Sequence, residues 1–215
     1  MKSWYKSFAE LSAVEKEGLA FRVRIKKRGT AWAVIAPHGG GIEAGTSEIA
    51  NAISSKGLSL YTFDGIRQSG NELLHITSTL FDEPRGVALV QSSEYILAIH
   101  GCEGWESQVY VGGLEVAVGD QLIATLQSSG FSSVRATTQF HGTQPENICN
   151  RGRLGRGVQL EISEGLRRSL FKSLDRNGRK EPRPAFRTFV NAIAEVIPVE
   201  ASLLDRFGGI LQNIF

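Results

Sequence analysis

Ala36-Pro37-His38-Gly39-Gly40-Gly41-Ile42-Glu43 is the stretch that decides how this chain folds and where it can bind a ligand. The apolar run from Ala31 to Ala36 is typical of a buried strand. Three successive glycines would weaken a strand or a helix, so we expect the chain to turn sharply directly after His38. A histidine and a carboxylate are therefore presented together at a strand end, as in many divalent metal sites.

Two further apolar segments end in similar residues. Tyr95–Ile99 is apolar throughout and is followed by His100, and Val158–Ile162 carries Glu161 near its end. In open α/β sheets, ligands bind beyond the carboxyl ends of the strands. Two histidines and two carboxylates at three such strand ends are the residues that the active site of a mononuclear zinc hydrolase needs. There, two His and one Glu bind the metal, water takes the open position and a second Glu acts as base.

The order of the apolar segments predicts one α/β domain covering residues 1–215. Because strand-like and helix-like segments alternate, we expect a mixed, mostly parallel open sheet with helices on both faces. The expected strands are residues 20–26, 32–36, 58–63, 73–77, 95–99, 109–111, 131–136 and 158–162. The expected helices are residues 5–18, 46–54, 84–91, 116–127, 164–174 and 185–196. The long connection 137–156 is typical of a functional or mobile loop.

Length and composition exclude several classes of protein. The chain has 215 residues, of which 41% are hydrophobic, enough for a sizeable core. It has no apolar run of the length needed to cross a membrane. Met1–Lys6 lacks the apolar stretch of a signal peptide, so we expect cytosolic synthesis, and release on phage-induced lysis would leave the same sequence. Cys102 and Cys149 are too few for a disulfide framework, and we expect free thiols.

Positive charge is concentrated in one part of the chain. Residues 151–187 contain eleven Lys or Arg and four Asp or Glu, a net charge of +7, whereas the whole chain carries +2. This stretch is either a solvated basic face or a surface that attracts a polyanion.

Each candidate site residue also has an interpretation that needs no metal. His38 could cap a strand end, with Glu43 opening the next helix, where acids suit the helix dipole. His100 could be a core-edge histidine. His75 falls in an expected strand and could be a ligand, a hydrogen-bonding support or a core residue, the latter two being favoured. Glu161 could form a structural salt bridge to Arg151 or Arg167, because a carboxylate inside an apolar strand is costly unless it is used or paired.

The loop around Asn147–Arg153 offers groups that suit a carboxylate substrate. Arginine binds carboxylates through two parallel hydrogen bonds, and asparagine can hold an amide or a carboxylate. We therefore expect Arg151 and Asn150, together with Asn71 and His75, to form the substrate-binding part of the site.

The chain resembles the poly-γ-glutamate hydrolase family of phages and Bacillus-like bacteria in a series of short blocks that occur in the expected order. The blocks are Pro37–Glu43, Gly70-Asn71, Leu74–Ser78, Ala98–Gly101, Tyr110–Gly113, Asn147–Gly152, Gly157–Ile162 and Gly165–Arg167. The resemblance implies a zinc enzyme with a carboxypeptidase-like core, zinc ligands His38, Glu43 and His100, and Glu161 as the catalytic carboxylate. Zinc carboxypeptidases have a shorter His-to-Glu spacing, so kinship with them is distant.

The sequence thus predicts a zinc-dependent hydrolase that cleaves γ-glutamyl amide bonds of poly-γ-glutamate, an anionic capsule or biofilm polymer that the basic stretch would attract. A second hypothesis keeps the metal and changes the substrate, to cell-wall peptides or acyl-amino acids cleaved by a zinc amidase or carboxypeptidase. A third is a phage-related nucleic-acid-binding replication protein. It explains the basic stretch but leaves the two histidine strand ends and Glu161 without a role, so we expect neither nucleic acid nor a membrane as partner.

Overall fold

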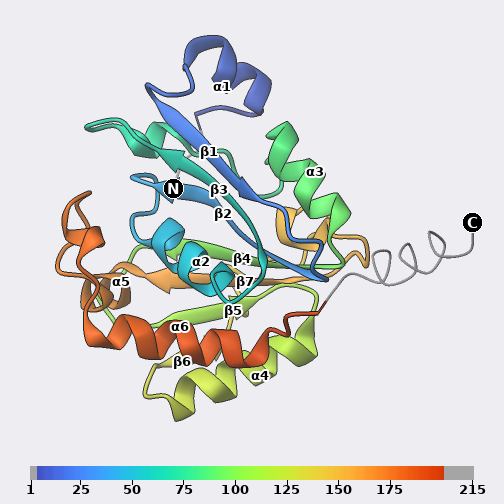
Figure 1. Cartoon of the computed structure of the whole chain (residues 1–215), viewed down its shortest axis with the longest axis vertical. Coiled ribbons are helices and arrows are strands. Elements are labelled where there is room, and N and C mark those ends of the chain that lie inside the picture. The colour runs from blue at the N-terminus through green and yellow to red at the C-terminus, as the bar shows by residue number, and fades with distance from the viewer. Residues whose placement is uncertain (1–3, 201–215) are drawn as a thin grey trace, which may run out of the picture.

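A seven-stranded mixed sheet forms the centre of the structure, a computed structural model that describes residues 4–200 (Figure 1). The strand order is β1-β3-β2-β4-β7-β5-β6. The pairs β1–β3 and β7–β5 are antiparallel, and the other pairs are parallel. The strands are β1 (Phe21–Lys26), β2 (Trp32–Gly40), β3 (Ser59–Gly65), β4 (Tyr95–Cys102), β5 (Val109–Gly112), β6 (Ser133–Arg135) and β7 (Val158–Ser163). This confirms the predicted α/β class.

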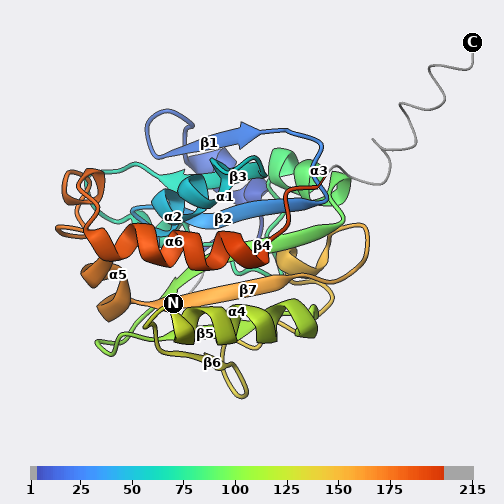
Figure 2. The same cartoon turned by 60° about the horizontal axis from the view of Figure 1, so that its bottom comes forward.

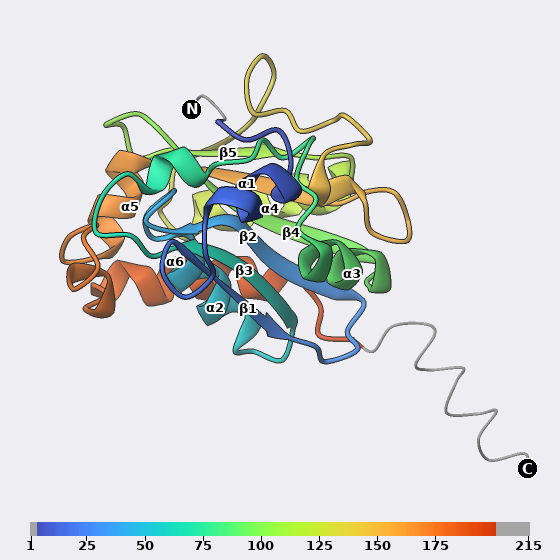
Figure 3. The ribbon, with the colours of Figure 1, turned by 90° about the horizontal axis from the view of Figure 1, so that it is seen from above.

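Helices cover both faces of the sheet. They are α1 (Phe8–Val14), α2 (Thr46–Ser54), α3 (Pro84–Ser92), α4 (Val116–Ser128), α5 (Glu164–Leu170) and α6 (Pro184–Val196), with short 3₁₀ turns η1 (Asn71–Leu74), η2 (Ile148–Asn150) and η3 (Gly178–Lys180). Figures 2 and 3 show α4 and α6 on one side of the sheet and α1 and α3 on the other. Within residues 4–200, every helix is too short or too polar to cross a membrane.

The central strands separate two hydrophobic cores because successive side chains of a strand point to opposite faces. In β4, Leu97 and Ile99 face the core under α2, α4, α5 and α6, and Ile96 and Ala98 face the core under α1 and α3. Burial on both faces explains why these strands are continuous apolar runs in the sequence. The same alternation places His100 at the end of β4 on the α1/α3 side.

The connections from β2 create a switch point at the centre of the sheet. β2 pairs in parallel with β3 on one side and with β4 on the other. The chain therefore leaves β2 in one direction and later returns on its other side, which opens a crevice beyond the carboxyl ends of β2 and β4. His38 and His100 lie at these two ends.

Two of the predicted local structures are wrong. The chain does not turn directly after His38, because β2 continues through Gly40 and its register with β3 shifts between Ala36 and Gly39. The turn follows at residues 41–45. Residues 73–77 form no strand: η1 is followed by an irregular segment, and β1 already occupies the sheet edge beside β3. The segment looked strand-like because Leu74 and Ile76 both pack into the core.

The glycine run is required because β2 and β3 approach closely there. Gly40 has φ +66°, and a Cβ atom on it would lie 2.4 Å from the carbonyl oxygen of Gly65. Gly155 has the same φ of +66° with no other heavy atom within 4 Å of such a Cβ. The two glycines therefore differ in packing and not in φ.

We predict that Gly155→Ala lowers the free energy of unfolding by about 1–2 kcal/mol, the cost of a left-handed residue. Gly40→Ala should lower it clearly more, because the strand backbones must also move apart. Urea unfolding of both variants checks this. Equal losses would show that backbone conformation alone requires glycine at position 40.

Candidate metal centre

A cavity of about 530 Å³ lies at the carboxyl ends of β2, β4 and β7. The polar side chains around it come from segments far apart in the sequence. They include His38 from β2, Glu43 from the following turn, His75 from the segment after η1, His100 from β4 and Glu161 from β7. The structure therefore brings the four residues predicted as ligands and base into one cavity.

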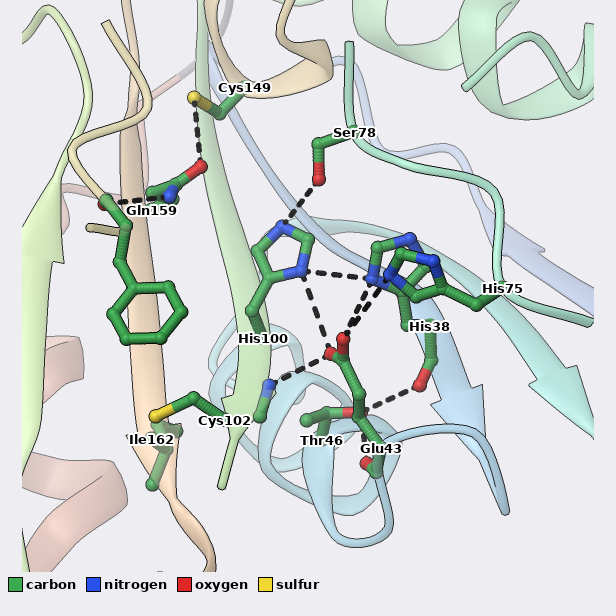
Figure 4. A network of polar contacts seen from close by, with 12 residues as sticks. His38, Glu43, Thr46, His75, Ser78, His100, Cys102, Cys149, Gln159 and Ile162 are labelled. Atoms are coloured by element: carbon green, nitrogen blue, oxygen red, sulfur yellow. Dashed lines mark hydrogen bonds and ion pairs between the residues drawn. The ribbon is translucent and has the colours of Figure 1, made fainter. Parts of the chain in front are cut away.

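His38, Glu43 and His100 meet at one point, as Figure 4 shows. His38 Nδ1 lies 2.9 Å from Glu43 Oε1 and 3.1 Å from His100 Nδ1, and His100 Nδ1 lies 3.6 Å from Glu43 Oε2. All three side chains are buried. Both imidazoles thus present the same ring nitrogen, Nδ1, to a single carboxylate.

Contacts on the outer side of this cluster fix how the ligand atoms point. His38 Nε2 lies 2.7 Å from the carbonyl oxygen of Ile76, a contact in which Nε2 donates. On His100, Nε2 lies 3.5 Å from Ser78 Oγ. The backbone N–H of Gly101 donates to Glu43 Oε2 at 2.8 Å. Such contacts hold metal-binding rings in place, and with a metal bound they would let the inward nitrogen of His38 act as a ligand.

The separations between the two ring nitrogens and the two oxygens of the Glu43 carboxylate suit a tetrahedral zinc site. Bonds of about 2.0–2.2 Å at tetrahedral angles separate ligand atoms by roughly 3.3 Å. The observed separations of 2.9, 3.1 and 3.6 Å lie on both sides of that value. A buried carboxylate is costly without a positive partner, and a divalent cation between these atoms would supply one. The residues present therefore fit zinc, and their role as its ligands stays a prediction.

His75 is a further candidate ligand beside the cluster. Its Nε2 lies 3.8 Å from Glu43 Oε1, and its ring centroid lies 4.0 Å from that of His38. One ligand atom each from His38, Glu43 and His75 lie within 4.8 Å of one another. Burial lowers the pKa of His75 to about 3, so its ring is neutral and able to bind a metal or a hydrogen-bonding group.

Glu161 lies next to the cluster on β7. It is in register with His100 of β4 on one side and with Tyr110 of β5 on the other, so all three side chains share the cavity face of the sheet. Burial raises the pKa of Glu161 to about 7, although the charge of His100 acts against this. Neither predicted arginine pairs with Glu161, because Arg151 and Arg167 donate to carbonyl groups. A carboxyl group whose pKa lies near neutral pH is suited to accept and return a proton.

Burial and charge act in opposite directions on the other titratable groups. Burial would raise the pKa of Glu43, but the charge of His38 and the hydrogen bonds from His100 and His38 hold it well below its usual range. Burial would lower the pKa of His100, but its hydrogen bond to Glu43 and the charge of Glu161 raise it. The cluster therefore favours a carboxylate at Glu43 and a positive charge beside it.

One buried side chain ties the three strand ends together. The guanidinium of Arg167 on α5 donates to the carbonyl oxygens of Ala44 at 2.7 Å, Cys102 at 2.9 Å and Ile162 at 3.0 Å. Ala44 directly follows Glu43, Cys102 lies two residues beyond His100, and Ile162 directly follows Glu161. Arg167 thus holds the segments that carry the candidate ligands and the candidate base at fixed separations.

Three of the predicted substrate-binding residues do not line this cavity. Arg151 donates from Nη1 to the carbonyl oxygen of Phe81 at 2.7 Å. Asn150 is buried, and its side chain bonds only backbone groups of the surrounding loop. Asn71 bonds the backbone of Arg67 and lines a different cavity. A substrate-binding role for these residues in the metal cavity stays a prediction that their positions do not support, because residue type and nearness in the sequence do not decide which way a loop side chain points.

The basic stretch is not one surface. Arg167 is buried, Arg168 and Lys172 pair with Glu164 and Glu181, and Arg183 and Arg187 line a cavity beside α6. A smaller group, Arg176, Arg179 and Lys180, lines cavities near the carboxyl ends of β2 and β3. The stretch therefore does not form one continuous basic surface.

Some residues of the site were missed from the sequence. Tyr110 could have been found only through strand register, because it alternates with the apolar Val109 and Val111. Ser78 lies in a segment without regular structure, and the family block Leu74–Ser78 that contains it did not indicate its role. The role of Arg167 was hidden because its three partners come from separate parts of the chain.

The fold and the site define a protein with an α/β sheet and a zinc-type His–Glu–His cluster at its switch point. A family model described as poly-gamma-glutamate hydrolase matches residues 5–192. The chain belongs to the poly-γ-glutamate hydrolase family, as the short sequence blocks predicted.

Individual relatives agree with this assignment. The UPF0714 protein YndL of Bacillus subtilis (strain 168) is 40% identical over 169 residues, and this match spans 78% of the chain but just under two thirds, 66%, of YndL. The structure of a bacteriophage poly-gamma-glutamate hydrolase is similar with a TM-score of 0.89 at 32% identity, covering 97% of this chain and 100% of that one. A zinc-free apo structure of YndL has a TM-score of 0.85 at 36% identity, covering 91% and 97%.

We predict that Arg167→Met lowers the free energy of unfolding by about 3 kcal/mol or more, because it leaves three carbonyl groups without their donor. The matched control is Arg151→Met, which removes a guanidinium bonded to one carbonyl and should cost about 1 kcal/mol. Urea unfolding of the metal-free proteins gives both values. Loosened strand ends should also let an alkylating reagent reach Cys102 faster than in the wild type, with Cys149 as the internal reference. An Arg167→Met protein as stable as the control would contradict the bridging role.

Proposed function

We propose that this protein is a zinc-dependent hydrolase that cleaves the γ-glutamyl amide bonds of poly-γ-glutamate. The observation that carries the proposal is the meeting of His38 Nδ1, His100 Nδ1 and the Glu43 carboxylate, with Glu161 in the same cavity. Membership of the poly-γ-glutamate hydrolase family supports the substrate. The zinc-free form of YndL supports the metal, because a structure so described implies a form with zinc.

The chain's own residues would divide the work as follows. A zinc ion held by His38, Glu43 and His100 would polarise the scissile carbonyl and lower the pKa of a bound water. Glu161, next to His100 in the sheet, would take a proton from the attacking water and later give it to the leaving amine. Its position on the cavity face, in register with His100, supports this role. The positive charge of the metal would lower the raised pKa of Glu161 and so favour its basic form.

The direct test is incubation of the purified protein with poly-γ-glutamate, with and without a chelator, followed by sizing of the products. We expect chain shortening that stops with the chelator and returns with added zinc. An intact polymer beside hydrolysed cell-wall peptides or acyl-amino acids would instead favour the amidase function. Hydrolysis that continues at full rate after complete removal of metal would contradict the zinc chemistry.

We predict that His38→Ala and His100→Ala each weaken zinc binding far more than His75→Ala does. Loss of a ligand removes a metal bond, whereas loss of a supporting side chain typically costs roughly 10–100-fold in affinity. Competition with a chelating dye measures the affinity, and elemental analysis gives the zinc content. If His75→Ala loses zinc as fully as His38→Ala while His100→Ala retains it, the ligands are His38, Glu43 and His75.

We predict that Glu161→Gln keeps zinc but loses roughly 10²–10⁴-fold in kcat, the usual effect of removing a general acid–base group. The control is Glu164→Gln, which neutralises a nearby carboxylate that pairs with Arg168. This variant should keep most of its activity. Turnover rates and zinc contents of both proteins decide the matter. An active Glu161→Gln with an inactive Glu164→Gln would transfer the role of base to Glu164.

A further inference from the structure

A chain of cavities leads away from the metal cluster across the carboxyl ends of β2 and β3. A cavity of about 280 Å³ shares Glu43 and Gly101 with the metal cavity. It also shares Gly41 and Ala44 with a cavity of about 520 Å³ on its other side. The turn at residues 41–45 thus forms a common wall, and an extended ligand bound at the metal could continue along it.

The walls of the 520 Å³ cavity carry three arginines, two of which already have carboxylate partners. Arg67 pairs with Glu15, and Arg179 pairs with Glu48. Both pairs are partly buried and hold their side chains in place.

Arg176 differs from these two. It is exposed and lines the 520 Å³ cavity as well as an adjoining cavity of about 550 Å³. Its Nη2 donates to the backbone carbonyls of Ile66 and Arg67, which anchors the guanidinium at the end of β3. Within residues 4–200 no carboxylate pairs with it. An anchored guanidinium with its remaining N–H groups unused is a suitable receptor for a carboxylate.

Acidic groups along this path weaken the attraction between Arg176 and an anionic ligand but do not cancel it. Asp175, in the same cavity, accepts the backbone N–H groups of Asn177 and Gly178 at 2.8 and 2.9 Å. Glu164 is paired with Arg168 in the connecting cavity. Among the described residues, Arg176 therefore provides the positive charge of the 520 Å³ cavity that no carboxylate pairs, and Asp175, whose oxygens accept backbone N–H groups, provides a negative one.

We propose that the 520 Å³ cavity, with Arg176 as its anchor, is a subsite that binds a side-chain carboxylate of the polyanion at a distance from the bond being cleaved. The inference rests on the proposed function, because it takes poly-γ-glutamate as the ligand, and it assigns to Arg176 the role that the sequence suggested for Arg151. A polymer with one free carboxylate per residue would reach this cavity while a short fragment fills only the metal cavity.

The test compares Arg176→Gln with Arg187→Gln, which removes the same charge from the same basic stretch but beside α6. The KM of each protein is measured for long poly-γ-glutamate and for a γ-glutamyl dimer. Arg176→Gln should raise the ratio of the polymer KM to the dimer KM by roughly tenfold, the effect of one lost charge-assisted hydrogen bond. Arg176→Lys should give an intermediate ratio, and Arg187→Gln should leave the ratio as in the wild type. The wild-type ratio should rise with ionic strength, less steeply in Arg176→Gln.

Two outcomes would overturn the subsite: an unchanged ratio in Arg176→Gln, whether or not both KM values rise together, or an equal change of the ratio in Arg187→Gln. Binding of labelled poly-γ-glutamate to the metal-free proteins gives a second measurement that needs no hydrolysis. If the wild type cleaves neither substrate but binds the polymer through Arg176, the subsite stands and the proposed activity fails. If the metal-free wild type and Arg176→Gln bind equally well, the subsite fails whatever the activity.

Discussion

The contacts of the Arg167 guanidinium are the interaction on which the site depends. Its three carbonyl partners belong to the turn after β2, the end of β4 and the end of β7. Strands in a sheet are held by backbone hydrogen bonds along their length, but beyond their last paired residues these ends need another support. A single cation aimed at three carbonyl dipoles supplies it. Leu166 and Leu170 also pack into the core, so the helix α5 that carries Arg167 is itself held in place.

This placement also has an electrostatic consequence. Arg167 is 6% exposed, and burial lowers the pKa of its guanidinium while the charge of Glu43 acts against this. Arginine remains charged even so, because its unperturbed pKa is very high. A permanent positive charge thus stands behind two carboxyl groups, Glu43 and Glu161. Lysine would be a poor replacement, since its three donors sit on one nitrogen, whereas Arg167 reaches its carbonyl partners from three separate nitrogens of a planar fork.

The hydrogen bonds around the histidines prepare the ligand cluster in the same way. The carbonyl of Ile76 is available to His38 because the chain after η1 runs irregularly past the end of β2 instead of pairing as a strand. Had residues 73–77 formed a strand, that carbonyl would have been used within the sheet. The same irregular segment carries His75 and Ser78 to the cavity. The departure from regular structure is therefore what surrounds the cluster with polar groups.

The sequence by itself determined the parts of this protein that depend on neighbouring residues. Apolar runs ending in His38 and His100 indicated buried parallel strands, and the carboxyl ends of parallel strands meet at one edge of the sheet. The mixed sheet, the two-sided core and the candidate ligands followed from that rule. The glycine run was correctly seen as special, although its purpose is the close approach of β2 to β3 and not an immediate turn.

Only the tertiary structure decided what depends on distant residues. Strand register placed Tyr110 beside Glu161, and the packing of α5 brought Arg167 to three separate carbonyls. The orientation of loop side chains turned Arg151 towards Phe81 and left Arg176 facing a cavity. Residue type and local spacing carry no information on such directions. They are set by hydrogen bonds to backbone groups far away in the chain, which exist only once the sheet has formed.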